Sequence, residues 1–327
     1  MPKSSRSKIH SLSKPFQGYR TRKGRYWIAS IEDWLESRYA RELNGNVNLI
    51  VTSPPFPLSR KKSYGNLNGS AYLDWLRRLA PKLRQLLADD GSLVIEIGNA
   101  WNPGEPTMST LPMEALLAVR DSGDLNLCQE FICHNPARLP SPVQYVNVER
   151  SRIKDSWTRV WWLSPSKHPK ADNRNILVPY SKAMRDLLKR QSYNAGHRPS
   201  EHVIGEKSFL RDNGGAIPAS CLLQETLDHF GSVVVAGNTK SGGDPYLEYC
   251  RRKGIKAHPA RMQEALARFF VSFLTDPDDL VLDPFGGSNT TGRIAEDLRR
   301  RWAVVEINHN NLIPSKQRFV TSRKRRR

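Results

Sequence analysis

Two hydrophobic patterns alternate through the first half of the chain and return near its end. Short, nearly continuous apolar runs are typical of buried strands, and apolar residues spaced three and four apart are typical of helices packed on one face. Strands are predicted at 26–29, 47–51, 93–97, 129–133, 158–163, 280–282 and 302–307, and helices at 31–41, 71–88, 112–120, 261–274 and 290–300. A turn is predicted at 89–91. This alternation predicts an α/β fold with a doubly wound, parallel, Rossmann-like sheet.

The regular pattern is interrupted between residues 165 and 254. Residues 165–215 contain ten Lys or Arg against five Asp or Glu, and glycines and prolines recur in them. A segment without strand or helix periodicity, placed between two regular α/β parts, predicts a smaller inserted lobe.

Positive charge is concentrated at the two ends of the chain. The 327 residues include 51 Lys or Arg and 32 Asp or Glu, which gives a formal net charge of +19. Residues 1–25 hold eight of the basic residues and 321–327 hold five, with no acid in either segment. This charge predicts a polyanionic partner, and the ends are expected to be flexible tails that add salt-dependent, sequence-independent affinity.

Several classes of protein are excluded by the sequence. No run approaches the roughly 18 consecutive apolar residues of a membrane span, and no secretory signal opens the chain. The four cysteines and eight histidines show no metal-binding spacing, and no cysteine follows a proline. We therefore expect a soluble, non-secreted protein with reduced thiols and no metal site.

The sequence Ser-Pro-Pro-Phe at residues 53–56 follows the apolar run 47–51 and carries the first candidate chemistry. Two prolines fix the torsion φ and remove two N–H donors, so the chain leaves the strand as a stiff, extended elbow. The elbow presents a serine hydroxyl, a free prolyl carbonyl and an aromatic ring. This combination suits a site that holds the amino group of a planar ring. From these residues alone, a plain loop that ends the strand is the alternative.

The second candidate motif is the glycine-rich turn at 283–292, between a predicted strand and a predicted helix. Its glycines permit close approach of a ligand, and Ser288 or Thr290 can cap the helix. It lacks the Gly-Lys-Ser/Thr of triphosphate-binding loops and a full Gly-x-Gly-x-x-Gly. Asp283 can pair with an ammonium group, and Glu306 can accept both hydroxyls of a ribose. S-adenosylmethionine matches this description.

Together these motifs resemble those of the amino-group DNA methyltransferases, in particular the cytosine-N4 members of type II restriction–modification systems. The resemblance is carried by residues 52–56, 60–66 and 283–292, and Glu306 and residues 256–261 add to it. A serine at the start of the first motif resembles the cytosine-N4 subtype. With this motif first and the cofactor motif last, the order is similar to that of the permuted β group.

The resemblance implies a methyltransferase sheet with a smaller DNA-recognition lobe, and roles for particular residues. It implies catalytic roles for Ser53, Pro54, Pro55 and Phe56, and cofactor contacts from Asp283, Phe285, Gly287, Ser288, Thr290 and Glu306. Arg60, Lys61 and Lys62 are expected to contact DNA phosphates, with solvated loop charge as the alternative. The chain departs from the family pattern at Ser30, where Asp is usual, and at Asn289, where a second glycine is usual.

The same resemblance implies a division of the chain and a reaction. The division places a flexible tail at 1–25, the catalytic half at 26–164, the target-recognition region at 165–254, the cofactor half at 255–313 and a second tail at 314–327. The expected reaction is methyl transfer to N4 of a cytosine flipped out of double-stranded DNA. It would take place in a prokaryotic cytoplasm, where a cognate restriction endonuclease shares the target site. An adenine-N6 methyltransferase and a non-catalytic DNA-binding protein on this scaffold are the alternatives.

Overall fold

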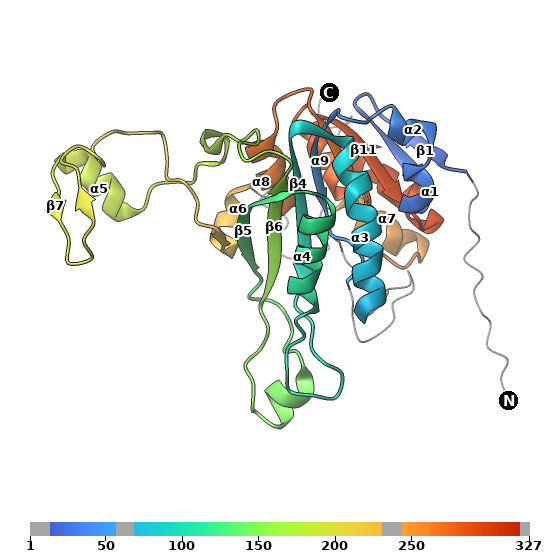
Figure 1. Cartoon of the computed structure of the whole chain (residues 1–327), viewed down its shortest axis with the longest axis horizontal. Helices are drawn as coiled ribbons and strands as arrows, with labels where there is room; N and C mark the ends of the chain where they lie inside the picture. The colour runs from blue at the N-terminus through green and yellow to red at the C-terminus, as the bar shows by residue number, and fades with distance from the viewer. Residues whose placement is uncertain (1–13, 57–68, 231–243, 260, 321–327) are drawn as a thin grey trace.

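The structure is a computed structural model that describes residues 14–56, 69–230, 244–259 and 261–320 (Figure 1). Within these residues, a mixed sheet of nine strands has the order β1-β2-β11-β10-β3-β4-β6-β5-β9. The strands are β1 (Phe16–Arg20), β2 (Gly24–Ile28), β3 (Val47–Thr52), β4 (Leu87–Gly98), β5 (Asn126–His134), β6 (Trp157–Ser164), β9 (Cys221–Leu222), β10 (Leu280–Asp283) and β11 (Arg301–Glu306). The predicted α/β class is confirmed.

The central strands are parallel, and the winding of the chain reverses between β10 and β3. β10 lies parallel to β11 on one side and to β3 on the other, and β3 is parallel to β4. Open α/β sheets bind ligands at such a switch point, outside the carboxyl ends of the strands. Those ends are Thr52 in β3 and Asp283 in β10, so the two predicted motifs meet there although they are far apart in the sequence.

Helices cover both faces of the sheet. In chain order, the helices and helical turns of the described residues are α1 (Ile31–Leu35), α2 (Arg38–Arg41), α3 (Gly69–Leu86), α4 (Leu111–Ser122), the π-helical turn Gln144–Val148, the 3₁₀ turn Asn173–Ile176, α5 (Lys182–Arg190), α6 (Gln224–Phe230), α7 (Pro245–Lys253), α8 (Glu264–Leu274), α9 (Thr290–Asp297), the 3₁₀ turn His309–Asn311 and α10 (Leu312–Val320). The turn Gln144–Val148 and α5 lie in segments that project from the sheet (Figure 1). Buried side chains of α1, α3 and α4 form one apolar core, and those of α6, α8 and α9 form another on the opposite face. No helix in the described part of the chain is both long and apolar enough to cross a membrane.

The helix predicted at 31–41 is instead two short helices. The Ser37 hydroxyl accepts a hydrogen bond from the Ala40 amide and so caps a new helix that begins at Arg38. A serine side chain competes with the backbone in this way, and it ends one helix and starts the next.

Two other predicted boundaries are also wrong. The residues 89–91, predicted as a turn, bulge within β4, which pairs with β3 at Leu87 and again at Ser92. The helix predicted at 261–274 begins three residues late, at Glu264. The remaining predicted strands and helices between residues 47 and 307 are confirmed, with their ends shifted by a few residues.

Both predicted tails are shorter than expected. β1 pairs antiparallel with β2, so the predicted tail at 1–25 is wrong from Phe16 onward. Arg318 of α10 is buried against the body, so the tail predicted at 314–327 is wrong up to residue 320. Residues 1–13 and 321–327 lie outside the described part of the chain.

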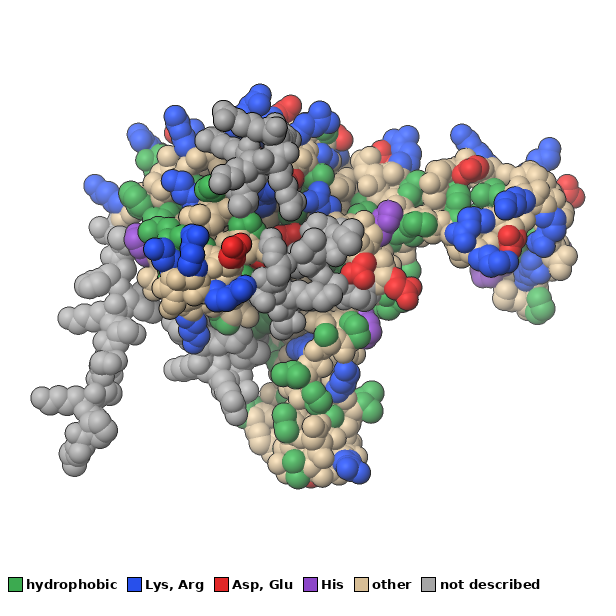
Figure 2. Space-filling model, turned by 180° about the vertical axis from the view of Figure 1, so that it is seen from behind, with side chains coloured by type: hydrophobic (Ala, Val, Ile, Leu, Met, Phe, Trp, Pro, Cys, Tyr) green, Lys and Arg blue, Asp and Glu red, His purple; other side chains and the backbone are tan. Residues whose placement is uncertain are grey.

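Two segments project from the sheet (Figures 1 and 2). The first, which we call the arm, is residues 180–215 and contains α5 and the two-stranded ladder of β7 (Gly196–His197) and β8 (Val203–Ile204). In the other described residues of the predicted lobe at 165–254, β9 pairs with β5 and α7 packs on α10, so these parts belong to the body. The second, which we call the hairpin lobe, is residues 135–156 between β5 and β6. The sequence did not predict it.

Candidate active site

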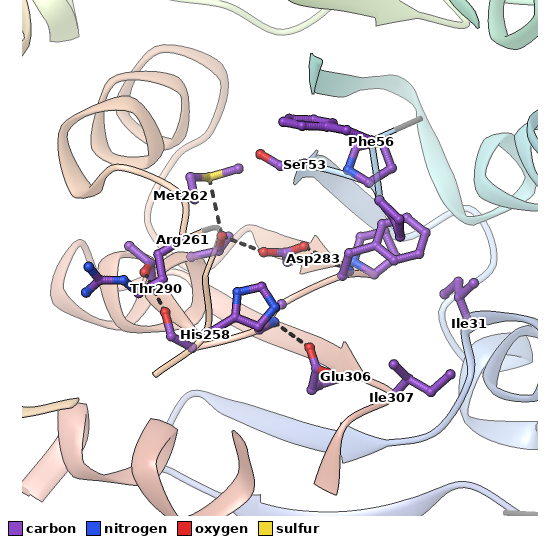
Figure 3. Close-up of a pocket in the computed structure, with 18 of the residues that line it drawn as sticks. Ile31, Ser53, Phe56, His258, Arg261, Met262, Asp283, Thr290, Glu306 and Ile307 are labelled. Carbon is purple, nitrogen blue, oxygen red and sulfur yellow. Dashed lines mark hydrogen bonds between the residues drawn. The ribbon is translucent and has the colours of Figure 1, made fainter. Parts of the chain in front are cut away.

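A cavity of about 280 Å³ opens at the switch point between β10 and β3. Its lining includes every catalytic and cofactor residue predicted from the sequence, namely Ser53, Pro54, Pro55, Phe56, Asp283, Phe285, Gly287, Ser288, Thr290 and Glu306. In Figure 3, Asp283 lies between Ser53 and Phe56 on one side and Glu306 on the other. The predicted phosphate contacts at 60–62 lie outside the described residues.

The Ser53 hydroxyl is held by a carboxylate on the neighbouring strand. Ser53 Oγ donates to Glu96 Oε2 at 2.7 Å, and Thr158 Oγ1 donates to Glu96 Oε1 at 3.0 Å. Burial raises the pKa of Glu96, and the two hydrogen bonds oppose that rise because they stabilise the carboxylate. Since the Ser53 proton is directed to Glu96, the lone pairs of the serine oxygen remain available to accept a hydrogen bond.

Glu96 was missed from the sequence, although a signal was present. It is the only charged residue in the apolar run 93–97. Because β3 and β4 are parallel with Thr52 opposite Ile95, the next residue of each chain segment, Ser53 and Glu96, lies side by side. A lone carboxylate in a buried strand needs a hydrogen-bonding partner, and strand pairing would have supplied one.

The Phe56 ring lies next to Ser53 (Figure 3) and packs where β4 ends in a glycine. A Cβ atom at Gly98 would lie only 3.3 Å from the ring, so the glycine leaves room for it. Phe56 is half-buried and also packs against the core formed by α1, α3 and α4. An aromatic face beside a hydrogen-bond acceptor suits a planar group that carries an N–H donor.

Asp283 is buried and fixed by three donors. Thr52 Oγ1 donates to its Oδ1 at 2.7 Å, Thr291 Oγ1 donates to its Oδ2 at 2.7 Å, and the Phe285 amide donates to its Oδ1 at 3.0 Å. Burial raises the pKa of Asp283, and these donors lower it. An ionised carboxylate offers about four acceptor positions, so capacity remains for a ligand. Thr52 and Thr291 belong to the motifs at 52–56 and 283–292, but the sequence did not assign either of them a role.

Glu306 ties the end of β11 to the glycine-rich turn. It accepts the Gly287 amide at Oε2, at 2.8 Å, and the Asn308 amide at Oε1, at 2.6 Å. Burial is the largest effect on its pKa, which is raised to about 7. The Tyr26 hydroxyl donates to the Gly287 carbonyl at 2.9 Å, and a Cβ atom at Gly287 would lie 3.3 Å from the His258 ring. The turn is therefore held closely on both sides.

Asn289, which stands where a glycine is usual, keeps the backbone conformation that the turn needs. Its φ is +57°, in the left-handed region that favours glycine and that asparagine tolerates. Its Oδ1 accepts the Gly292 amide at 3.0 Å and its Nδ2 donates to the Tyr19 hydroxyl at 2.9 Å. Asn289 is thus the N-cap of α9, and the prediction that Ser288 or Thr290 caps the helix is wrong.

Ser30, the second departure, has a local structural role. Its Oγ accepts the Asp33 amide at 3.0 Å and so caps α1. The cavity is lined by its neighbours Ala29 and Ile31 and by Glu32. Ser30 itself does not belong to that lining.

Arg318 braces the glycine-rich turn from behind, a role that the sequence did not reveal. Its Nε donates to the Ser288 carbonyl at 2.8 Å, and its guanidinium pairs with Asp244 at 3.2 Å and with Glu264 at 3.4 Å. The guanidinium carbon also lies 5.3 Å from the centre of the Tyr246 ring. A buried arginine with this many partners fixes α10 against the turn.

Comparisons with known proteins agree on one family. The sequence profile of a family described as DNA methylase, N6_N4_Mtase, matches residues 47–313. The chain is 40% identical to the type II methyltransferase M.PvuII of Proteus hauseri over 319 aligned residues. The alignment covers 97% of this chain and 89% of that protein. It is 22% identical over 273 residues to the type II methyltransferase M.BglII of Bacillus subtilis, over 81% of this chain and 61% of that protein. A solved structure of PvuII DNA methyltransferase (cytosine-N4-specific) is similar, with a TM-score of 0.70 and 33% identity over 93% of this chain and 88% of that one.

Proposed function

The chain belongs to the DNA methylase family, and from this premise we propose that it transfers a methyl group from S-adenosylmethionine to N4 of a cytosine in double-stranded DNA. Cytosine-N4 chemistry is supported by the description of the similar solved structure and by the serine that begins the 53–56 motif. The observation that carries the proposal is the Ser53–Glu96 hydrogen bond, because it leaves a hydrogen-bond acceptor in the cavity that also contains Asp283 and Glu306.

The cavity fits S-adenosylmethionine in charge and hydrogen-bonding capacity. Glu306 would accept the ribose hydroxyls, and Asp283 would pair with the ammonium group; burial raises the pKa of both. The Tyr72 hydroxyl, which is buried in the cavity lining, has no hydrogen-bond partner among the described residues, and a polar ligand group would satisfy it. When bound, S-adenosylmethionine supplies an electrophilic methyl group on a positively charged sulfur.

The target side of the cavity is suited to activate an amino group. The lone pair of an exocyclic amine is delocalised into its ring, and acceptors at Ser53 Oγ and the Pro54 carbonyl would favour a pyramidal, more nucleophilic nitrogen. As the nitrogen bonds to the methyl carbon, the carbon–sulfur bond would break and its electron pair would stay on the sulfur, which leaves as a neutral thioether. One amine proton would pass to Ser53 Oγ while the Ser53 proton passes to Glu96 Oε2, 2.7 Å away. The raised pKa of Glu96 favours this transfer.

The DNA would be held outside the cavity and the target base turned into it. A base inside the duplex cannot reach Ser53, so the cytosine must be flipped, with Phe56 stacked on its face. The region 165–254 supplies candidate base and phosphate contacts, since α5 in its arm carries four exposed cations, Lys182, Arg185, Lys189 and Arg190. The cations at 60–62 remain proposed phosphate contacts.

The biological setting follows from the proposed reaction. Methylation at a fixed site would protect host DNA in a prokaryotic cytoplasm from a restriction endonuclease that reads the same sequence. The endonuclease need not bind the methyltransferase, because the two enzymes would share only their DNA site.

A labelling experiment tests the proposal. The purified protein is incubated with plasmid DNA and S-adenosylmethionine labelled in its methyl group, and the DNA is then digested to nucleosides. We expect the label in N4-methyldeoxycytidine, with transfer slowed by about 100-fold or more in a Ser53→Ala variant. Label in N6-methyldeoxyadenosine would show that the target base is adenine and not cytosine. No transfer by a protein that binds both cofactor and DNA would indicate a non-catalytic binding protein.

A further inference from the structure

Several large apolar side chains of the hairpin lobe are exposed to solvent. Leu139 is 80% exposed, Val143 58%, Val148 65% and Ile153 89%. Figure 2 shows apolar and basic side chains together on this lobe, below the body of the molecule. A cluster of exposed apolar side chains on an ordered element indicates a surface with a partner.

The base of the lobe is braced by hydrogen bonds and an ion pair. Buried Asp155 accepts a hydrogen bond from Asn99 Nδ2 at 2.9 Å and pairs with Arg138 at 3.5 Å. Arg138 Nη1 also donates to the Trp157 carbonyl at 2.8 Å, and Arg152 Nε reaches across to the Pro106 carbonyl at 2.9 Å. The apolar side chains are therefore presented on a braced support.

The lobe is directly connected to the target side of the cavity. It continues from β5 and into β6, and β6 pairs with β4 so that Thr158 lies opposite Gly98. Thr158 donates to Glu96, the partner of Ser53, and Gly98 packs on the Phe56 ring. The lobe thus leaves the sheet at the same edge as the elbow that would receive a flipped base.

Charge on the lobe selects among its possible partners. Ile153, the most exposed of these apolar side chains, stands between the exposed cations Arg152 and Lys154. Apolar side chains flanked by cations match a duplex, where phosphates surround stacked bases, and proteins that deform DNA insert apolar wedges between base steps. A purely apolar protein partner would not require these cations.

We propose that the hairpin lobe inserts Ile153 and Leu139 into the duplex beside the target base and stabilises the DNA from which that base has been flipped. This rests on the proposed function. Flipping breaks the pairing and stacking of the target base and leaves a gap in the stack, and an apolar side chain in or beside the gap offsets part of that cost. The lobe would then act at the place that the base leaves in the duplex, and the elbow would act on the flipped base in the cavity.

The test compares two duplexes that differ in the cost of flipping. Both carry the site that the wild-type protein methylates, and in one the target cytosine faces an abasic position instead of guanine. We expect the double variant Leu139→Ser/Ile153→Ser to lose about tenfold or more in kcat/KM on the paired duplex and to recover most of it on the abasic one. Ile313→Ser, a substitution of an exposed isoleucine on α10, is the matched control and should behave as wild type on both.

Several outcomes would overturn the inference. An undiminished rate on the paired duplex would show that the lobe does not act on DNA. An equal loss on both duplexes would show a role unrelated to flipping. A variant whose sedimentation shows a changed oligomeric state, together with loss of activity, would assign the apolar surface to a second copy of the chain. Failure of the wild-type protein to methylate either duplex would instead contradict the proposed function.

Discussion

The two sides of the cavity are held in place in different ways. On the cofactor side, Glu306 accepts two backbone amides, and Asp283 accepts one amide and two threonine hydroxyls. On the target side, the Ser53 hydroxyl donates to a single side chain, Glu96. A hydrogen bond from a backbone amide remains available when neighbouring side chains are substituted. A hydrogen bond between two side chains is lost when either side chain is substituted. We therefore expect graded losses of affinity from the cofactor side and large losses of chemistry from the target side.

The largest effect is expected for Ser53→Ala. Loss of the acceptor for the target amine should reduce kcat by roughly 100-fold to 1000-fold. The dissociation constant for S-adenosylmethionine should stay within about twofold of wild type, because the cofactor side is unchanged. Single-turnover methylation and calorimetric titration measure the two effects. If Ser53→Ala weakened cofactor binding as much as it slowed methylation, the distinction between the cofactor side and the target side would be wrong.

The next effect is expected for Glu96→Gln, which keeps the shape and removes the carboxylate. Ser53 would lose its proton acceptor, and kcat should fall by about 10-fold to 100-fold. In the wild type, kcat should fall as pH drops through the raised pKa of Glu96, because the protonated acid no longer accepts the Ser53 proton. The variant should lack this acidic limb. A pH–rate profile with the same limb in both proteins would argue against the role of Glu96.

A smaller, pH-dependent effect is expected at Glu306. Its pKa of about 7 means that the unliganded site is protonated in mild acid, whereas ribose hydroxyls require the carboxylate. Affinity for S-adenosylmethionine should therefore rise up to tenfold per pH unit, roughly between pH 5 and 7, with a proton released on binding. Glu306→Gln should bind more weakly and without this dependence. Calorimetry in buffers of different ionisation enthalpy measures both.

The unliganded protein should show the opposite trend in stability. The folded pKa of Glu306 is raised above its ordinary value of 4.5. Its protonation therefore stabilises the fold fully below about pH 4.5, and that contribution is lost as pH rises through about 7. Thermal melts of wild type and Glu306→Gln across this range isolate the contribution. If neither the affinity for S-adenosylmethionine nor the stability of the wild type depended on pH in this range, the raised pKa of Glu306 would be contradicted.

The smallest effect is expected for Asn289→Gly, which restores the glycine usual in the family. Glycine adopts the left-handed φ, but the cap on the Gly292 amide and the hydrogen bond to Tyr19 are lost. We expect about 1 kcal/mol less stability, or a melting temperature lower by a few degrees. Cofactor affinity should change little, and a large loss would show that Asn289 itself contacts the ligand. Asn289→Ala, which also strains φ, is the harsher comparison.

Much of the fold and of the cofactor side could be predicted because the signals are local. Apolar runs marked β3, β10 and β11, and the glycine-rich turn with Glu306 after the next strand marked the cofactor side. Both predicted motifs line the cavity because each follows a parallel strand at the switch point.

The remaining features depend on residues brought together only by folding. Glu96 finds Ser53 through strand pairing across 43 residues, and Arg318, which in sequence belongs to a basic tail, is buried against Asp244 across 74 residues. β1 could not be recognised, since it lies in the basic segment 1–25, whose composition is that of a disordered tail, and only folding packs Tyr19 in the core. The hairpin lobe has no periodicity to detect, because its apolar side chains do not face a core.

The order of strands in the sheet has a consequence for how the protein is made. β10 and β11 lie in the middle of the sheet but come late in the chain. While a ribosome is still translating residues before 280, β3 has β4 on one side and an open hydrogen-bonding edge with apolar side chains on the other, and such edges pair readily with other chains. The nascent protein therefore exposes β3, the strand that leads into Ser53, for most of its synthesis. The elbow gains its cofactor side only when the centre of the sheet is filled.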